Sequence, residues 1–172
     1  TGLTYTASST SNSHSTVADS FTTAAYTNNQ GTRNWATNWT ETNDGANNIL
    51  ITGGELQLNN DASNEPTIQR RVDLNGATSA VLSFKYRTTA GVDSADSISI
   101  CGRRQSTDGW TCPLTLGTFT GITGASSGTY SVNLSYIVTL TATAEIMFQF
   151  AANTYDDTAA NESFLVDDLS II

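Results

Sequence analysis

The chain has 172 residues, a length that suits one domain with its own core. Sixteen acidic residues against seven Lys and Arg give a net charge of −9, and a surface of this sign repels nucleic-acid phosphates and anionic lipid. No apolar run of about 18 residues occurs, so we expect no membrane insertion. Cations and neutral sugars are partners that this composition permits. Because the chain begins at Thr1 without Met or a signal peptide, we also expect a mature, processed product.

The first 18 residues differ in composition from the rest of the chain. Ten of them are Ser or Thr, and bulky apolar side chains are limited to Leu3, Tyr5 and Val17. Such a segment buries too little apolar surface to hold itself in place. We therefore expect residues 1–18 to form an extended arm that pairs as an added strand with a neighbouring copy. Leu3, Tyr5 and Val17 would make that subunit contact, and the domain proper would span residues 19–172.

Two tryptophans follow the arm. If residues 35–40 form a strand, Trp35 and Trp39 lie on the same face, because side chains alternate with a period of two. We expect this face to be the core. In the alternative, both rings stack on sugars together with Tyr26.

Short alternating segments, rather than helical periods, fill the body of the chain. Residues 81–87 place Leu82, Phe84 and Tyr86 on one face, and residues 145–150 repeat this pattern with Ile146, Phe148 and Phe150. Further strands are expected at residues 35–40, 49–51, 55–58, 67–74, 97–101, 114–119, 130–134 and 164–171. Expected turns are Gly53-Gly54, Asn75-Gly76, Asp108-Gly109 and Ser127-Gly128. The pattern predicts an all-β fold, an antiparallel two-sheet jelly-roll sandwich.

The only cysteines, Cys101 and Cys112, flank the Asp108-Gly109 turn. We expect them to form a disulfide across a hairpin, with two reduced core thiols as the alternative. One disulfide and a lysine-poor, hydroxyl-rich composition predict a secreted or cell-surface protein. Three sequons for N-glycosylation also occur, at Asn38, Asn133 and Asn161.

Asp167 and Asp168 lie inside an otherwise apolar C-terminal segment, where aspartate is disfavoured. Alternation would turn one carboxylate inward, and a buried carboxylate needs a cation or several donors. We expect a structural calcium site at Asp168, because calcium binds oxygen ligands. The further acids considered as its ligands are Asp19, Glu41 and Asp44. The alternative partner is an arginine, either Arg70 or Arg71.

The remaining candidate residues are aromatic or basic. Trp110 follows a turn and is the aromatic side chain most expected to be exposed; Trp35 and Tyr155 are further candidates for stacking on a glycan. The doublets Arg70-Arg71 and Arg103-Arg104 should split across their sheet and form surface ion pairs.

Six segments in a fixed order carry a family resemblance. They are residues 19–21 (DSF), 34–41 (NWATNWTE), 49–56 (ILITGGEL), 69–84, 106–110 (STDGW) and 164–171 (FLVDDLSI). The chain resembles bacterial secreted jelly-roll modules, which are similar to galactose-binding-like, MAM-like and carbohydrate-binding domains. The resemblance implies a sandwich of roughly eight to ten strands with its terminal strands adjacent. It implies no single activity, and the two cysteines depart from its pattern.

Catalytic motifs are missing from the sequence. The only histidine, His14, lies in the arm, and no HExxH, P-loop or nucleophile elbow occurs. We therefore predict a non-enzymatic extracellular protein under two hypotheses. In the first, it is the subunit of a fibre, a homopolymer built by N-terminal strand addition. In the second, it is a calcium-stabilised carbohydrate-binding module of a larger secreted protein, with glycans as partners.

Overall fold

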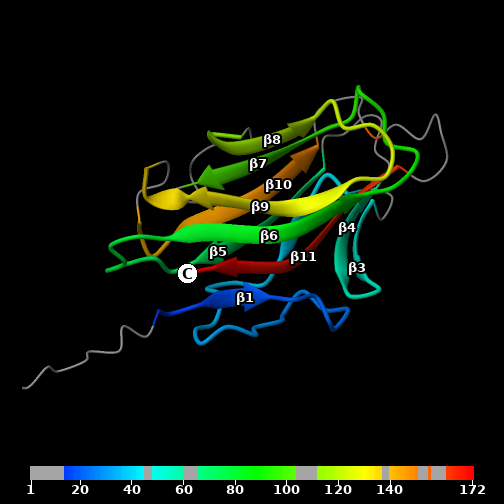
Figure 1. The fold of residues 1–172 in the computed structure, drawn as a ribbon. Helices are drawn as coiled ribbons and strands as arrows, with labels where there is room; N and C mark the ends of the chain where they lie inside the picture. The colour runs from blue at the N-terminus through cyan, green and yellow to red at the C-terminus, as the bar shows by residue number, and fades with distance from the viewer. Residues whose placement is uncertain are drawn as a thin grey trace, which may run out of the picture.

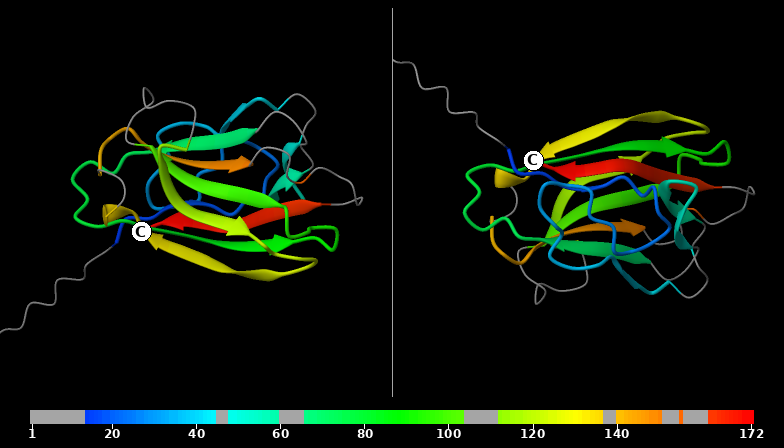
Figure 2. Two further views of the ribbon diagram at one scale, coloured as in Figure 1. Left: turned by 90° about the horizontal axis from the view of Figure 1, so that it is seen from above. Right: turned by 90° about the horizontal axis from the view of Figure 1, so that it is seen from below.

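The computed structural model describes residues 14–44, 48–59, 66–103, 112–136, 140–150, 155 and 162–172. They form two antiparallel β-sheets stacked as a sandwich (Figures 1 and 2), with one short 3-10 helix, η1 (Leu134–Tyr136). The predicted all-β jelly-roll sandwich is confirmed. In these described ranges, no helix has the length and apolar character needed to cross a membrane.

One sheet has six strands and contains both ends of the domain. Its path is β3 (Ile49–Thr52), β4 (Glu55–Asn59), β11 (Ser163–Ile171), β6 (Val81–Thr88) and β9 (Ser127–Asn133). The sixth strand, β1 (Val17–Asp19), pairs with the C-terminal part of β11 (Figure 1). The terminal strands are therefore adjacent, as the resemblance implies.

The second sheet has five strands. Its order is β2 (Thr40–Thr42), β5 (Thr67–Val72), β10 (Ala144–Phe150), β7 (Ser97–Arg103) and β8 (Leu114–Thr120). Alternation along β5 turns Ile68 and Val72 into the core and leaves Gln69 and Arg71 on the outer face. The outer face of this sheet holds the candidate site.

Aromatic rings fill the space between the sheets. Phe84 of β6 and Phe148 of β10 meet with their ring centroids 5.4 Å apart, which joins the two sheets directly. Phe119 of β8 packs against Phe164 of β11 at 4.9 Å. Burial of such rings is the largest apolar contribution to a sandwich core. The alternation read from residues 81–87 and 145–150 therefore identified the core faces correctly.

Two of the glycines within strands make room for tyrosines. A Cβ at Gly128 would lie 2.9 Å from the Tyr86 hydroxyl oxygen, and one at Gly117 would overlap the hydroxyl oxygen of Tyr130. The expected turn at Ser127-Gly128 is therefore wrong, because Gly128 belongs to β9 and is small to accommodate a neighbouring ring.

The described part of the N-terminal segment pairs within its own chain. Val17 lies opposite Ile171 of β11 and is 5% exposed, as part of the core of its own domain. Its assignment as a subunit contact is therefore wrong, and the domain begins before the predicted boundary at residue 18. Leu3 and Tyr5 lie outside the described residues.

A bulge in β11 changes the expected placement of its two aspartates. The register with β6 shifts between Asp167 and Ser170, and Asp168 has a φ of 48°. Asp168 therefore points outward, with its side chain 49% exposed and its carboxylate 2.6 Å from Lys85 Nζ. The inward carboxylate expected from strict alternation does not occur at this position.

Candidate functional site

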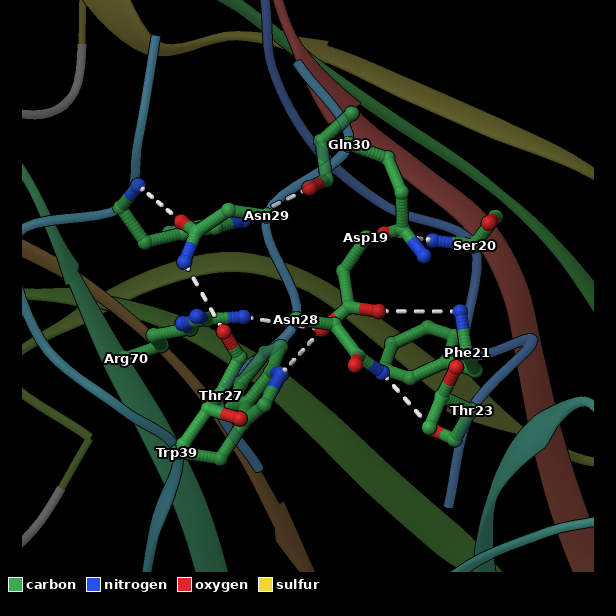
Figure 3. Close-up of polar contacts among 12 residues, drawn as sticks. Asp19, Ser20, Phe21, Thr23, Thr27, Asn28, Asn29, Gln30, Trp39 and Arg70 are labelled. Atoms are coloured by element: carbon green, nitrogen blue, oxygen red, sulfur yellow. Dashed lines mark hydrogen bonds and ion pairs between the residues drawn. The ribbon is translucent and has the colours of Figure 1, made fainter. Parts of the chain in front are cut away.

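A buried ion pair holds the long segment between β1 and β2 against the sandwich (Figure 3). The Asp19 carboxylate accepts hydrogen bonds from Arg70 Nη1 at 2.8 Å and from Trp39 Nε1 at 2.9 Å. It also accepts one from the backbone N–H of Phe21 at 2.9 Å. Both charged side chains are 0% exposed. These three donors satisfy a charge that could not otherwise remain buried.

Arg70 is held on its other sides by a carbonyl and two rings. Its Nε donates to the carbonyl oxygen of Thr37 at 2.9 Å. Its guanidinium carbon lies 4.9 Å from the ring centroid of Trp35 and 5.6 Å from that of Trp39. Burial lowers the pKa of Arg70 to about 10, although the charge and hydrogen bond of Asp19 oppose this change. The guanidinium therefore stays charged at neutral pH and interacts with the ring faces as a cation.

Two hydrogen bonds hold Trp35 in place. The indole Nε1 of Trp35 donates to the carbonyl oxygen of Ala18 at 3.0 Å, and its backbone N–H donates to Asn29 Oδ1 at 2.7 Å. Both tryptophan rings are core residues, as predicted, but they lie in a loop rather than in a strand. The loop leads directly into β2, so the same contacts position Thr37 and Thr40 beside β5.

A groove of about 320 Å³ opens beside these threonines on the outer face of the five-stranded sheet. Thr37 and Thr40 border it, the β5 residues Gln69 and Arg71 contribute next, and Glu145 comes from β10. Arg70 also contributes to its lining. The walls therefore offer hydroxyl, amide, guanidinium and carboxylate groups, which together both donate and accept hydrogen bonds.

A charged network runs along one side of this groove. Arg103 Nη2 lies 2.7 Å from Glu145 Oε1, and Arg71 Nε lies 3.4 Å from Glu145 Oε2. Arg103 Nη2 also donates to Gln69 Oε1 at 3.5 Å. Glu145 and Arg103 are each 3% exposed, although they lie on the outer face. The Arg70-Arg71 doublet splits across the sheet, as predicted. The outward-facing Arg71 and Arg103 contact Glu145 in a mostly buried network, whereas surface ion pairs had been predicted.

The predicted disulfide is confirmed on the same face. Cys101 of β7 bonds to Cys112, just before β8, with their Cα atoms 5.3 Å apart. Neither cysteine is therefore a reduced core thiol. Cys101 lies opposite Met147 of β10, and both side chains are buried. The disulfide thus fixes the β7–β8 pair beside the strand that carries Glu145.

The four acids considered as calcium ligands do not form one site, although Glu41 and Asp44 lie close to each other. Asp19 binds Arg70, and Asp168 binds Lys85. Glu41 accepts a hydrogen bond from the Tyr26 hydroxyl, and Asp44 accepts one from the backbone N–H of Asn48.

This arrangement corrects the predicted ligand set. No three His, Cys, Asp or Glu side chains gather as metal ligands anywhere in the described residues. The arginine alternative for Asp168 is also wrong, because Asp168 pairs with Lys85 and Arg70 pairs with Asp19. Calcium binding itself stays a prediction.

Burial also corrects the glycan-stacking candidates. Trp35 is 5% exposed and Tyr155 is 1% exposed, so neither ring can stack on a sugar in this conformation. Trp110 lies outside the described residues. Of the predicted glycosylation sites, Asn38 and Asn133 are exposed, and Asn161 lies outside the described residues; glycosylation stays a prediction.

Two further hollows, each of about 310 Å³, lie elsewhere on the domain. One is on the outer face of the six-stranded sheet, where Arg87 binds Glu55 with Nε at 2.7 Å. The other lies near the C-terminal Ile172 and contains the exposed Arg33–Asp73 pair at 3.8 Å. The groove on the five-stranded sheet differs from both in that a single carboxylate, Glu145, lies between two arginines.

Neither a family model nor a curated protein matches the chain. Among solved structures, it is similar to the K1 cleaved adhesin domain of Lys-gingipain from Porphyromonas gingivalis W83. The TM-score is 0.62 at 13% identity, over 91% of this chain and 97% of that one. The K2 cleaved adhesin domain of Lys-gingipain gives a TM-score of 0.59 at 13% identity, over 91% of this chain and 97% of that one.

A carbohydrate-binding module is similar as well. It is the family 11 module from Clostridium thermocellum in complex with a beta-1,3-1,4-mixed-linked tetrasaccharide. The TM-score is 0.53 at 16% identity, over 92% of this chain and 95% of that one. At such identities the likeness establishes the fold alone. The chain has the jelly-roll fold that adhesin and carbohydrate-binding modules share, as the sequence resemblance predicted.

Proposed function

We propose that this domain is a non-catalytic carbohydrate-binding module of a secreted protein. Its glycan lies in the groove on the outer face of the five-stranded sheet, bordered by Thr37 and Thr40 and lined by Gln69, Arg71 and Glu145. The fold supports this proposal in general terms, because solved structures of similar fold include both adhesin and carbohydrate-binding domains.

The observation that carries the proposal is a network of planar polar groups on the outer face of a sheet. Glu145 and Arg103 are nearly fully buried there, which fixes their geometry before any ligand arrives. Sugar hydroxyls both donate and accept hydrogen bonds, so fixed amide, carboxylate and guanidinium groups are suited to them. The disulfide supports an extracellular location, because disulfides persist in oxidising compartments.

The fibre hypothesis is not carried forward. Its described contact residue, Val17, packs in the core of its own domain, and β1 already pairs with β11 of the same chain. The edge of β1 that faces β11 is therefore occupied within the same chain.

Binding to an immobilised glycan panel, followed by affinity measurements on each glycan that is bound, tests the proposal. We expect Gln69→Ala to weaken binding about tenfold, which corresponds to about 1.4 kcal/mol. The matched control is Thr129→Ala, an exposed position of β9 on the other sheet, which should bind like wild type. Thermal unfolding confirms that both variants are folded. If no glycan on the panel is bound, or if the two variants bind equally well, the proposal is overturned.

A further inference from the structure

We infer that this groove selects a carboxylate-bearing sugar, a uronic acid, and that Arg71 is the residue that recognises the carboxylate. The inference rests on the proposed function and specifies its ligand class. Six Lys and Arg residues lie in the described part of the chain.

In five of these six residues, a terminal side-chain nitrogen lies within 4 Å of a carboxylate oxygen. The five pairs are Arg33–Asp73 at 3.8 Å, Arg70–Asp19 at 2.8 Å, Lys85–Asp168 at 2.6 Å, Arg87–Glu55 at 2.5 Å and Arg103–Glu145 at 2.7 Å. Arg71 is different. The closest contact of Arg71 with a carboxylate is made by its inner nitrogen, Nε, at 3.4 Å from Glu145. The seventh basic residue, Arg104, lies outside the described residues.

The environment of Arg71 explains this difference. Glu145 lies closer to Arg103 than to Arg71, and the Arg71 side chain is 35% exposed. The backbone N–H of Arg71 donates to Thr37 Oγ1, and its side chain donates from Nε to Glu145 Oε2. Among the described residues no hydrogen bond engages its two terminal nitrogens, which are therefore available to a ligand. The pair with Glu145 also restrains the guanidinium, because it anchors the Nε side of the group in the groove wall.

A restrained guanidinium with available terminal nitrogens is suited to a carboxylate. Its parallel N–H groups match the two oxygens of a carboxylate in a bidentate arrangement, which a single sugar hydroxyl cannot reproduce. The Gln69 amide and the Thr40 hydroxyl lie in the same groove and can bind the hydroxyls of that sugar. The groove thus combines one carboxylate receptor with neutral hydrogen-bonding groups.

The net charge of the chain makes this preference unexpected. At −9, the whole domain repels a polyanion at long range, and composition alone favours neutral sugars. The contact between Arg71 and a sugar carboxylate acts within a few ångströms, and the long-range repulsion by the negative domain opposes it. We therefore expect short uronate oligosaccharides to bind with higher affinity at moderate salt than at very low salt, because salt screens the repulsion first.

Calorimetric titration with matched ligands tests the inference. The probes are oligosaccharides of galacturonate, glucuronate, mannuronate and guluronate, each compared with its own methyl ester, which is neutral and nearly the same in shape. We expect at least one acid to bind tenfold more tightly than its ester. In Arg71→Gln this ratio should fall to about one. The control Arg87→Gln, on the outer face of the other sheet, should retain the wild-type ratio.

Arg71→Lys provides a second variant that keeps the positive charge. It should retain only part of the preference, because an ammonium lacks the two parallel donors. Equal affinity for acid and ester in the wild type, or an unchanged ratio in Arg71→Gln, would overturn the inference. Binding of neutral glycans that depends on Gln69 would overturn the acid preference while preserving the proposed function. Failure to bind any glycan would overturn both.

Discussion

Asp19 illustrates how the partner of a single carboxylate determines its role. From the sequence, Asp19 was one of three acids considered as further ligands of a calcium ion at Asp168. In the structure its compensating charge is the guanidinium of Arg70, supported by the indole of Trp39. The sequence could not show this, because Asp19 and Arg70 are 51 residues apart and any of several bases could have been the partner.

Removing the Asp19 charge tests this arrangement. Asp19→Asn keeps the side-chain size but leaves the buried Arg70 guanidinium unpaired. We expect a loss of about 3 to 5 kcal/mol, seen as a Tm lower by roughly 10 °C for a domain of this size.

The control is Asp168→Asn, which breaks the exposed pair with Lys85 and should leave the stability nearly unchanged, because exposed ion pairs contribute little. Differential scanning calorimetry measures both variants. Equal effects would show that the Asp19–Arg70 pair is not a principal contact of the fold.

At the scale of the element, alternation predicted the strands well and failed at specific places. Strands such as β6 and β10 have large apolar residues at every second position, and their core faces were assigned correctly. The strand predicted at residues 35–40 was wrong, because two buried tryptophans four residues apart also fit a loop packed on the core. The facing predicted for Asp167 and Asp168 was wrong because a bulge inserts a residue in the strand, and strict alternation cannot predict such an insertion.

The groove itself could not be predicted from the sequence. Its residues come from a loop, from β5 and from β10, and only the sheet order places β5 beside β10. The single usable signal was that Arg71 and Glu145 occupy outward positions in their strands. Alternation gave the face of each residue but not its neighbour on the next strand.

The β7–β8 hairpin depends on its disulfide. Replacing Cys101 and Cys112 together by Ser should lower the free energy of unfolding by about 3 kcal/mol, because the bond restricts a short loop in the unfolded chain. Denaturant unfolding with and without a reductant measures this change. Addition of a reductant should reproduce the loss in wild type and leave the double variant unaffected. A wild type that is insensitive to full reduction would contradict this expectation.

For the whole molecule, the two outer faces of the sandwich differ in how their charges are arranged. On the six-stranded sheet, Arg87 and Lys85 are each matched closely to a carboxylate. On the five-stranded sheet, Glu145 lies between two guanidinium groups and leaves the terminal nitrogens of Arg71 available. The two outer faces of one fold thus differ in how their charges are paired, a distinction that net charge alone does not reveal.

An NMR titration of ¹⁵N-labelled domain with a glycan that it binds tests the location of the site most directly. We expect the largest amide shifts along β5 and β10, centred on Gln69, Arg71 and Glu145, and little change on β6 and β9. Shifts centred on Lys85 and Arg87 of β6 instead would place the ligand on the other sheet and contradict the account.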